Sequence, residues 1–164
     1  RALQGHVQML QEKARFIAAV PLDQNLAAQG SFFAPCAFEL NDLSILTREI
    51  FGPVLHVYRY KAKDIDALIA QINEKGFGLT FGVHSRIESF QKRMTSNIRA
   101  GNAYVNRTMI GAVVGSQPFG GMGLSGTGPK AGGPHYLARF AQERVISTDT
   151  TAAGGNASLV SLEE

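Results

Sequence analysis

Glu49 is an acidic side chain whose surroundings favour a binding role. It opens the pentapeptide EIFGP at residues 49–53, in which Pro53 disfavours a helical backbone at Gly52 and so indicates a turn that enters a strand. A carboxylate accepts two hydrogen bonds at once, which suits the paired hydroxyl groups of a ribose. For a Glu and a Phe taken alone, a solvated carboxylate and a core ring are the more ordinary interpretation.

A second candidate is the glycine-rich stretch at residues 101–133, which holds ten of the 18 Gly of the chain. Glycine weakens regular elements, so this density predicts a shaped loop, and loops of this length are usually functional or disordered. We expect a packed loop whose backbone approaches a ligand or another domain, because a disordered linker would contain fewer apolar residues. Those that interleave with the glycines are Val105, Ile110, Val113, Val114, Phe119 and Leu124.

The remaining reactive side chains form no catalytic or metal-binding pattern. Cys36 is flanked by Pro and Ala, whereas a nucleophilic Cys needs a cation or a helix N-terminus beside it, so we expect a buried structural role. His6, His56, His84 and His135 lack metal-ligand spacing, which favours packing or surface roles. No dinucleotide fingerprint or Walker-type phosphate loop occurs. The sequence therefore predicts neither a catalytic residue nor a metal site within this chain.

Apolar periodicity predicts an α/β fold in which strands and helices alternate. A buried strand is expected at residues 16–20, and Asp64 is expected to cap a helix. Residues 85–88 read as a capping box that opens a further helix, with Ile87 facing inward and Gly101 just past its end. The order of the elements implies βαβ units and a parallel sheet. The predicted helices cover residues 3–14, 64–76, 87–98 and 134–142, and the predicted strands cover residues 16–20, 54–60, 79–83, 104–105 and 144–151.

Composition describes an ordinary globular chain of about one domain. It has 164 residues, 45% of them hydrophobic and 18% charged. Lys and Arg are scattered despite the net charge of +3, which argues against nucleic-acid binding, and no apolar run approaches a membrane span. A single Cys suits a cytoplasmic protein. The start lacks both Met and a signal-peptide pattern, so we expect a piece of a longer polypeptide.

The glycine-rich stretch resembles the C-terminal part of the aldehyde dehydrogenases. The similarity rests on GSQPFGG at residues 115–121 and LSGTG at residues 124–128. The extension PKAGGPHY at residues 129–136 is similar to the pyrroline-5-carboxylate (glutamate semialdehyde) dehydrogenase branch. Within that branch it resembles the proline utilization A proteins, in which the enzyme is fused to proline dehydrogenase. The resemblance extends from about residue 30 to about residue 156.

This resemblance implies NAD-dependent oxidation of glutamate semialdehyde to glutamate in proline catabolism. Glu49 would bind the nicotinamide ribose of NAD, and Phe51 would pack near the nicotinamide. Gly111 and Ala112 would anchor the substrate carboxylate, although some relatives carry Ser at the second position, and Phe119 would pack on the methylene chain. The catalytic Cys and the dinucleotide-binding domain precede this segment in the family, so the fragment alone is expected to be inactive. FAD would belong only to a fused proline dehydrogenase domain outside this chain.

The resemblance also implies a division of the chain. Residues 1–142 would be the C-terminal portion of the catalytic domain, residues 143–151 an oligomerisation strand, and residues 152–164 a linker and tail. The expected partners are the rest of the parent polypeptide, the small-molecule substrate and further copies of the chain, without nucleic-acid or membrane contact. Two alternatives stay open: a non-enzymatic assembly module, and an aldehyde dehydrogenase of another specificity.

Overall fold

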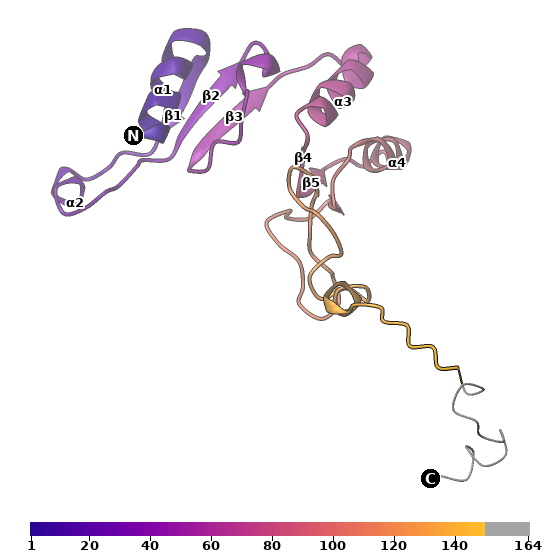
Figure 1. Ribbon diagram of the computed structural model, residues 1–164. Coiled ribbons are helices and arrows are strands. Elements are labelled where there is room, and N and C mark those ends of the chain that lie inside the picture. Colours follow the sequence, from indigo (N-terminus) through magenta and orange to yellow (C-terminus); the bar gives the residue numbers. More distant parts are fainter. Residues whose placement is uncertain (150–164) are drawn as a thin grey trace.

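The computed structural model describes residues 1–149 and shows two lobes followed by a projecting arm (Figure 1). Among the described residues, no helix has the length and apolar character needed to cross a bilayer. The first lobe contains α1 (Ala2–Lys13), β1 (Arg15–Ala19), α2 (Gln24–Ala27), β2 (Cys36–Leu40), η1 (Leu43–Ile45) and β3 (Val54–Tyr58). The second contains η2 (Ala62–Asp64), α3 (Ile65–Glu74), β4 (Phe77–Gly78), β5 (Thr80–Val83), α4 (Glu88–Asn97), β6 (Asn102–Val105), β7 (Met122–Gly123) and η3 (Leu137–Phe140).

In the first lobe, α1 packs on a three-stranded sheet of order β1-β2-β3. Its core is formed by Leu10 of α1 together with Phe38 and Leu40 of β2, all at most 2% exposed. Fully burying each of these side chains contributes roughly 1.5–3 kcal/mol. Strand β2 is antiparallel to β1 and parallel to β3. The predicted helix with its apolar stripe is therefore confirmed.

Strand β1 lies where the sequence predicts a strand, but the expected burial is wrong. All five of its residues are exposed, because β1 is an edge strand that pairs with β2 alone. Phe16 is 54% exposed and touches the core through an edge-to-face contact with Phe38. A run of apolar residues can thus form an edge strand that remains exposed within this chain.

A histidine pair connects α1 to the sheet. The Nε2 atoms of His6 on α1 and His56 on β3 lie 2.8 Å apart, and His6 is only 7% exposed. Burial, followed by the positive charge of Arg48, lowers the pKa of His6. Burial, followed by the neighbouring His6, lowers the pKa of His56. Two of the four His residues therefore have the packing role that the sequence favours, although their pairing could not be foreseen.

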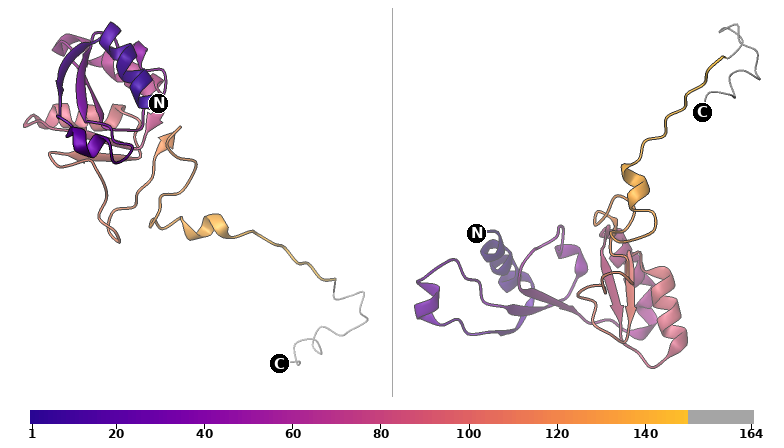
Figure 2. Two further views of the ribbon diagram at one scale, coloured as in Figure 1. Left: turned by 90° about the vertical axis from the view of Figure 1, so that its left-hand side faces the viewer. Right: turned by 90° about the horizontal axis from the view of Figure 1, so that it is seen from below.

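The second lobe contains a βαβ unit. Strands β5 and β6 are parallel, and α4 connects them. A core of Ile65, Ile69, Val83, Met94 and Ile98 joins α3, β5 and the end of α4. The predicted parallel pairing is confirmed here, whereas β3 and β5 belong to different sheets. The right-hand view of Figure 2 shows the two lobes joined through the link between β3 and α3.

The ends of the helices differ from the expected caps. Asp64 occupies the position before α3, but its side chain makes no capping hydrogen bond. The capping box is also absent, since Ser85 Oγ accepts a hydrogen bond from Ile87 N at 3.1 Å and α4 begins only at Glu88. The Asn106 amide explains this, because it bonds both the N–H and the carbonyl of Ser85, at 2.9 and 3.0 Å. Ile87, expected to face inward, is 64% exposed.

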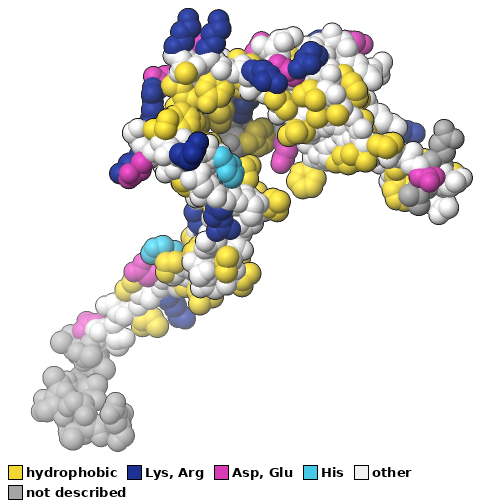
Figure 3. Space-filling view, turned by 180° about the vertical axis from the view of Figure 1, so that it is seen from behind, with side chains coloured by type: hydrophobic (Ala, Val, Ile, Leu, Met, Phe, Trp, Pro, Cys, Tyr) yellow, Lys and Arg dark blue, Asp and Glu magenta, His cyan; other side chains and the backbone are white. Residues whose placement is uncertain are grey.

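Apolar side chains remain exposed over both lobes, and the face seen in Figure 3 carries them on each lobe. Phe32, Leu55 and Leu124 are 55%, 61% and 72% exposed. Most exposed apolar side chains on proteins occur singly, whereas contiguous apolar surface marks contact with other protein or ligand. The chain therefore offers apolar surface on both lobes for such contacts.

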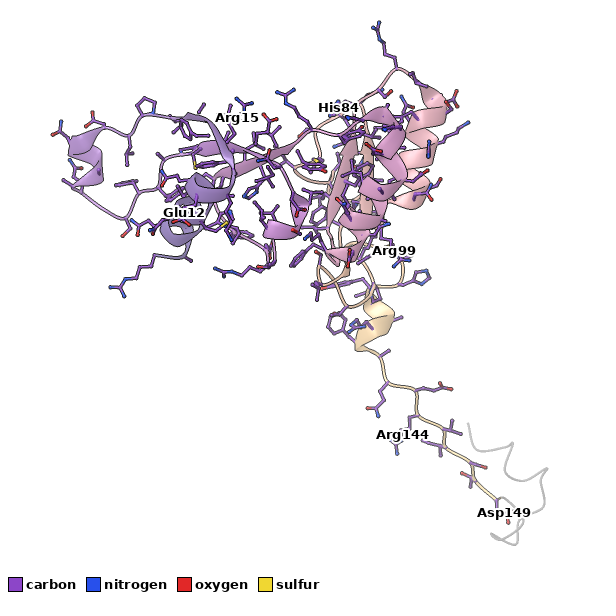
Figure 4. The ribbon with its side chains drawn as sticks, turned by 90° about the horizontal axis from the view of Figure 1, so that it is seen from above. Glu12, Arg15, His84, Arg99, Arg144 and Asp149 are labelled. Carbon is purple, nitrogen blue, oxygen red and sulfur yellow. The ribbon has the colours of Figure 1, made fainter. Side chains whose placement is uncertain are left out.

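Residues 141–149 form the arm and have no regular secondary structure. Arg144 and Asp149 lie along it, away from both lobes (Figure 4). The helix expected at residues 134–142 is reduced to the turn η3. The predicted oligomerisation strand at 143–151 falls largely on the arm, and its pairing stays a prediction. Its last two residues, like the tail at 152–164, lie outside the described residues.

Candidate functional site

The stretch at residues 101–133 contains the strands β6 and β7, and the rest of it is a loop tied to the second lobe by hydrogen bonds. The Asn102 side chain donates to the carbonyl of Pro118 at 2.9 Å and accepts from Gly120 N at 3.2 Å. Within the loop, Phe119 and Ala131 exchange two backbone hydrogen bonds of 3.1 and 2.9 Å. These contacts confirm the expected shaped and packed loop.

Gly101 lets this loop approach the lobe closely. A Cβ atom on Gly101 would lie 1.8 Å from the carbonyl oxygen of Gly120, which no side chain could tolerate. Its own N–H donates to Gly78 O at 2.9 Å, and the Lys130 ammonium group donates to its carbonyl. The sequence predicts Gly101 as the end of the preceding helix, which is wrong, because α4 is followed by Ile98 in an extended conformation. A glycine is needed at position 101 because the backbone at Gly120 lies against it.

The loop borders an open cavity of about 360 Å³ that gathers the predicted substrate residues. Gly111, Ala112 and Phe119 all line it. Its size falls within the range of small-molecule sites, and the rest of the lining consists of apolar residues, glycines and Gln117. Gly111 and Ala112 are half-buried, and their backbone N–H groups have no acceptor among the described residues. The cavity thus combines an apolar wall with two adjacent free donors.

Gln117 is a cavity residue to which sequence reasoning assigned no role. Its Oε1 accepts hydrogen bonds from Val113 N at 2.9 Å and from Arg107 Nη1 at 3.3 Å. The Arg107 guanidinium carbon lies 4.7 Å from the centre of the Tyr104 ring. The motif that carries the family resemblance contains Gln117, but the sequence offers no sign that Arg107 reaches it.

Glu49 and Phe51 lie on the first lobe, between η1 and β3, and line no part of the loop cavity. The Glu49 carboxylate is exposed and takes part in none of the ion pairs between the described residues. Phe51 is 90% exposed and borders a second cavity of about 720 Å³ beside the start of α1. The interpretation of Phe51 as a core ring is therefore wrong. A carboxylate with free oxygens and an uncovered ring fit contacts to a ribose and a planar nicotinamide.

Cys36 lies on β2, and its surroundings disfavour the reactive thiolate. It is half-buried, and this burial raises the pKa of the Cys36 thiol, which favours the protonated and unreactive form. Among residues 1–149, no group of three or more His, Cys, Asp and Glu side chains could hold a metal ion. The described part of the chain therefore presents binding groups: an exposed carboxylate, an exposed ring and a cavity with backbone donors.

Comparisons with known proteins agree on one family. The model of the aldehyde dehydrogenase family matches residues 2–146. The bifunctional protein PutA of Rhizobium meliloti is 50% identical over 138 residues, which are 84% of this chain and 11% of that protein. A crystal structure of a Bradyrhizobium japonicum proline utilization A mutant matches with a TM-score of 0.81 and 50% identity, over 92% of this chain and 15% of that one. The 1-pyrroline-5-carboxylate dehydrogenase of Thermus with bound NAD matches with a TM-score of 0.73 and 35% identity, over 85% and 27% of the two chains.

Proposed function

This chain belongs to the aldehyde dehydrogenase family, and we propose that it is the C-terminal part of an NAD-dependent glutamate semialdehyde (pyrroline-5-carboxylate) dehydrogenase of proline catabolism. The observation that carries the proposal is the cavity in which Gly111, Ala112 and Phe119 meet. The names of the relatives, PutA and 1-pyrroline-5-carboxylate dehydrogenase, support the choice of substrate. The catalytic Cys would come from a part of the parent polypeptide that precedes this chain. The apolar surface exposed on both lobes would pack against that parent.

The chemistry of the substrate explains why such a cavity is needed. Glutamate semialdehyde carries an α-carboxylate at the end away from its aldehyde, and burying an unpaired carboxylate is costly. Successive backbone N–H groups in a turn form a concavity that binds an anion. The free N–H groups of Gly111 and Ala112 are such donors, and Ala112 contributes its backbone only. Phe119 lies in the same cavity, where its ring would pack on the methylene chain.

The cofactor would be held from the first lobe. Glu49 would accept hydrogen bonds from the ribose hydroxyl groups, and Phe51 would cover one side of the nicotinamide. Bound NAD supplies the hydride acceptor for the oxidation. The residues of this chain hold and orient the two ligands and do not react with them.

Glu49→Ala in the full-length enzyme should raise the KM for NAD about tenfold to a hundredfold. Removing hydrogen bonds to a charged group costs roughly 1.5–3 kcal/mol, which corresponds to that change in affinity. Steady-state rates at varied NAD concentration measure it. Glu12→Ala is the matched control, since Glu12 is an exposed acidic residue near the opposite end of α1 from the cavity at Phe51 (Figure 4). An unchanged response of Glu49→Ala to NAD contradicts the assignment.

Activity assays test the proposed function directly. The full-length parent should form NADH from glutamate semialdehyde more efficiently than from an uncharged aliphatic aldehyde, and the isolated 164-residue chain should form none. A parent that prefers the uncharged aldehyde would be an aldehyde dehydrogenase of another specificity. A parent without any dehydrogenase activity would favour an assembly module. NADH formation by the isolated chain would show that the catalytic groups lie within it.

Deleting the segment after Gln142 in the full-length enzyme should shift its mass in solution toward the monomer. Val145 and Ile146 are 82% and 73% exposed on the arm, and an extended segment with open backbone groups can pair with the sheet edge of another subunit. Light scattering after size-exclusion chromatography measures the mass. A shorter deletion that removes only residues 153–164 is the control and should keep the assembly. If the longer deletion also keeps it, the arm does not join subunits.

A further inference from the structure

We propose that Gln117 is a further specificity-determining residue, whose side-chain amide donates a hydrogen bond to the substrate carboxylate and is held in place by Arg107. The inference rests on the proposed function, because it assigns one more contact to the same cavity. It starts from the lining, in which Gln117 is the polar side chain among apolar residues and glycines. Cavities of this kind select their ligands through a few placed polar groups.

The orientation of the Gln117 amide follows from its two partners. Val113 N–H and the Arg107 guanidinium both approach Oε1, and both can only donate. The reversed amide would place its NH₂ group against these two donors, so the oxygen must face them. The Nε2 donors are then directed away from Val113 and Arg107. They have no partner among the described residues, and a ligand in the cavity would supply the acceptor.

Arg107 adds positive charge behind this donor. Its guanidinium group is half-buried, donates through Nε to the carbonyl of Thr108 at 3.3 Å, and lies over the Tyr104 ring. No carboxylate pairs with Arg107 within the described part of the chain. A hydrogen bond from a cation to Oε1 polarises the amide and strengthens its N–H groups as donors. The arrangement favours a ligand with a carboxylate over one with an apolar or cationic end.

The alternative is a purely structural role, in which Gln117 only shapes the loop by binding Val113. Gln117→Glu separates the two roles. A Glu carboxylate accepts from Val113 N–H and pairs with Arg107, so the loop keeps its anchor, but the donors are lost and a negative charge faces the substrate. In the full-length enzyme we expect the KM for glutamate semialdehyde to rise by at least about tenfold. The KM for an uncharged aliphatic aldehyde of similar length should change less than about twofold.

Gln71→Glu is the matched control, since it makes the same change of charge on an exposed face of α3. Unchanged KM values in Gln117→Glu would overturn the donor role. An equal rise in KM for both aldehydes would mean that Gln117 only supports the structure of the loop. Gly111→Val distinguishes this failure from that of the proposed function. If Gly111→Val discriminates between the aldehydes and Gln117→Glu does not, the cavity binds the carboxylate without Gln117. If neither variant discriminates, the carboxylate site itself is wrongly placed.

Discussion

Gly111→Val in the full-length enzyme should raise the KM for glutamate semialdehyde by about a hundredfold. The branched side chain would prevent the carboxylate from reaching two backbone N–H groups, and each hydrogen bond to a charged group contributes roughly 1.5–3 kcal/mol. A Cβ atom at this position meets nothing within 4 Å among residues 1–149, so the loop itself should accommodate the substitution. The rise in KM would then reflect weaker binding of the substrate and not a folding defect.

The choice of aldehyde makes this result specific. A simple aliphatic aldehyde has no carboxylate to anchor, so its KM should change much less in the same variant. Gly111→Ala provides a graded control, because a single methyl group obstructs the approach less than an isopropyl group. Steady-state kinetics at saturating NAD compare the two substrates. Equal losses on both would mean that the loop shapes the site as a whole, and the carboxylate anchor would have to lie elsewhere.

Gly101→Val in the same enzyme should destabilise the fold by roughly 3 kcal/mol or more, at or above the upper end of the range for overpacking substitutions. The new Cβ atom would lie 1.8 Å from the carbonyl oxygen of Gly120, and neither backbone segment can yield without losing its hydrogen bonds. Activity on every aldehyde should fall with the folded fraction, in contrast to the selective effect at Gly111. The two substitutions thus distinguish the role of Gly101 in holding the loop from the role of Gly111 in binding the substrate.

Thermal unfolding of the full-length enzyme measures the effect at Gly101. Gly5→Ala is the control, because Gly5 lies within α1 and a Cβ atom there meets no described residue within 4 Å. Alanine should raise stability at this position by up to about 1 kcal/mol, since glycine weakens a helix interior. A Gly101→Val enzyme with unchanged melting temperature would show that the loop does not approach the lobe so closely.

Patterns of apolar residues predicted most of the helices and strands, because burial of one face repeats with the period of the element. Helix α1 and strand β5 follow directly from such patterns. The details that failed depend on neighbours distant in sequence. Glu88 could not close the capping box because Asn106 already accepts from the Ser85 N–H, and the pairing of His6 with His56 joins residues 50 positions apart. Exposure of β1 likewise depends on which strands lie beside it.

The candidate site was predictable where a contiguous motif carries it. Gly111, Ala112 and Phe119 were expected from the family resemblance, and they line one cavity. Glu49 and Phe51 were expected in the same way, but no feature of the sequence indicated that the ring would be exposed. Arg107 was missed because its contact with Gln117 depends on the course of the loop between them. A sequence motif identifies which residues belong to the site. Which charged side chain lies beside them depends on how the backbone folds.

The His6–His56 pair should make the fold sensitive to acid through proton linkage. Both pKa values lie below the ordinary value of about 6.5, so the unfolded chain takes up protons before the native one. The contribution of the pair is complete above pH 6.5 and declines as pH falls below it. The melting temperature of the full-length enzyme should therefore drop between pH 7 and pH 5, and less steeply with both residues replaced by Phe. The same replacement at the exposed His84 of the second lobe is the control (Figure 4). If the melting temperature of the double variant falls with pH as steeply as that of the unchanged enzyme, the pair is not the proton sensor.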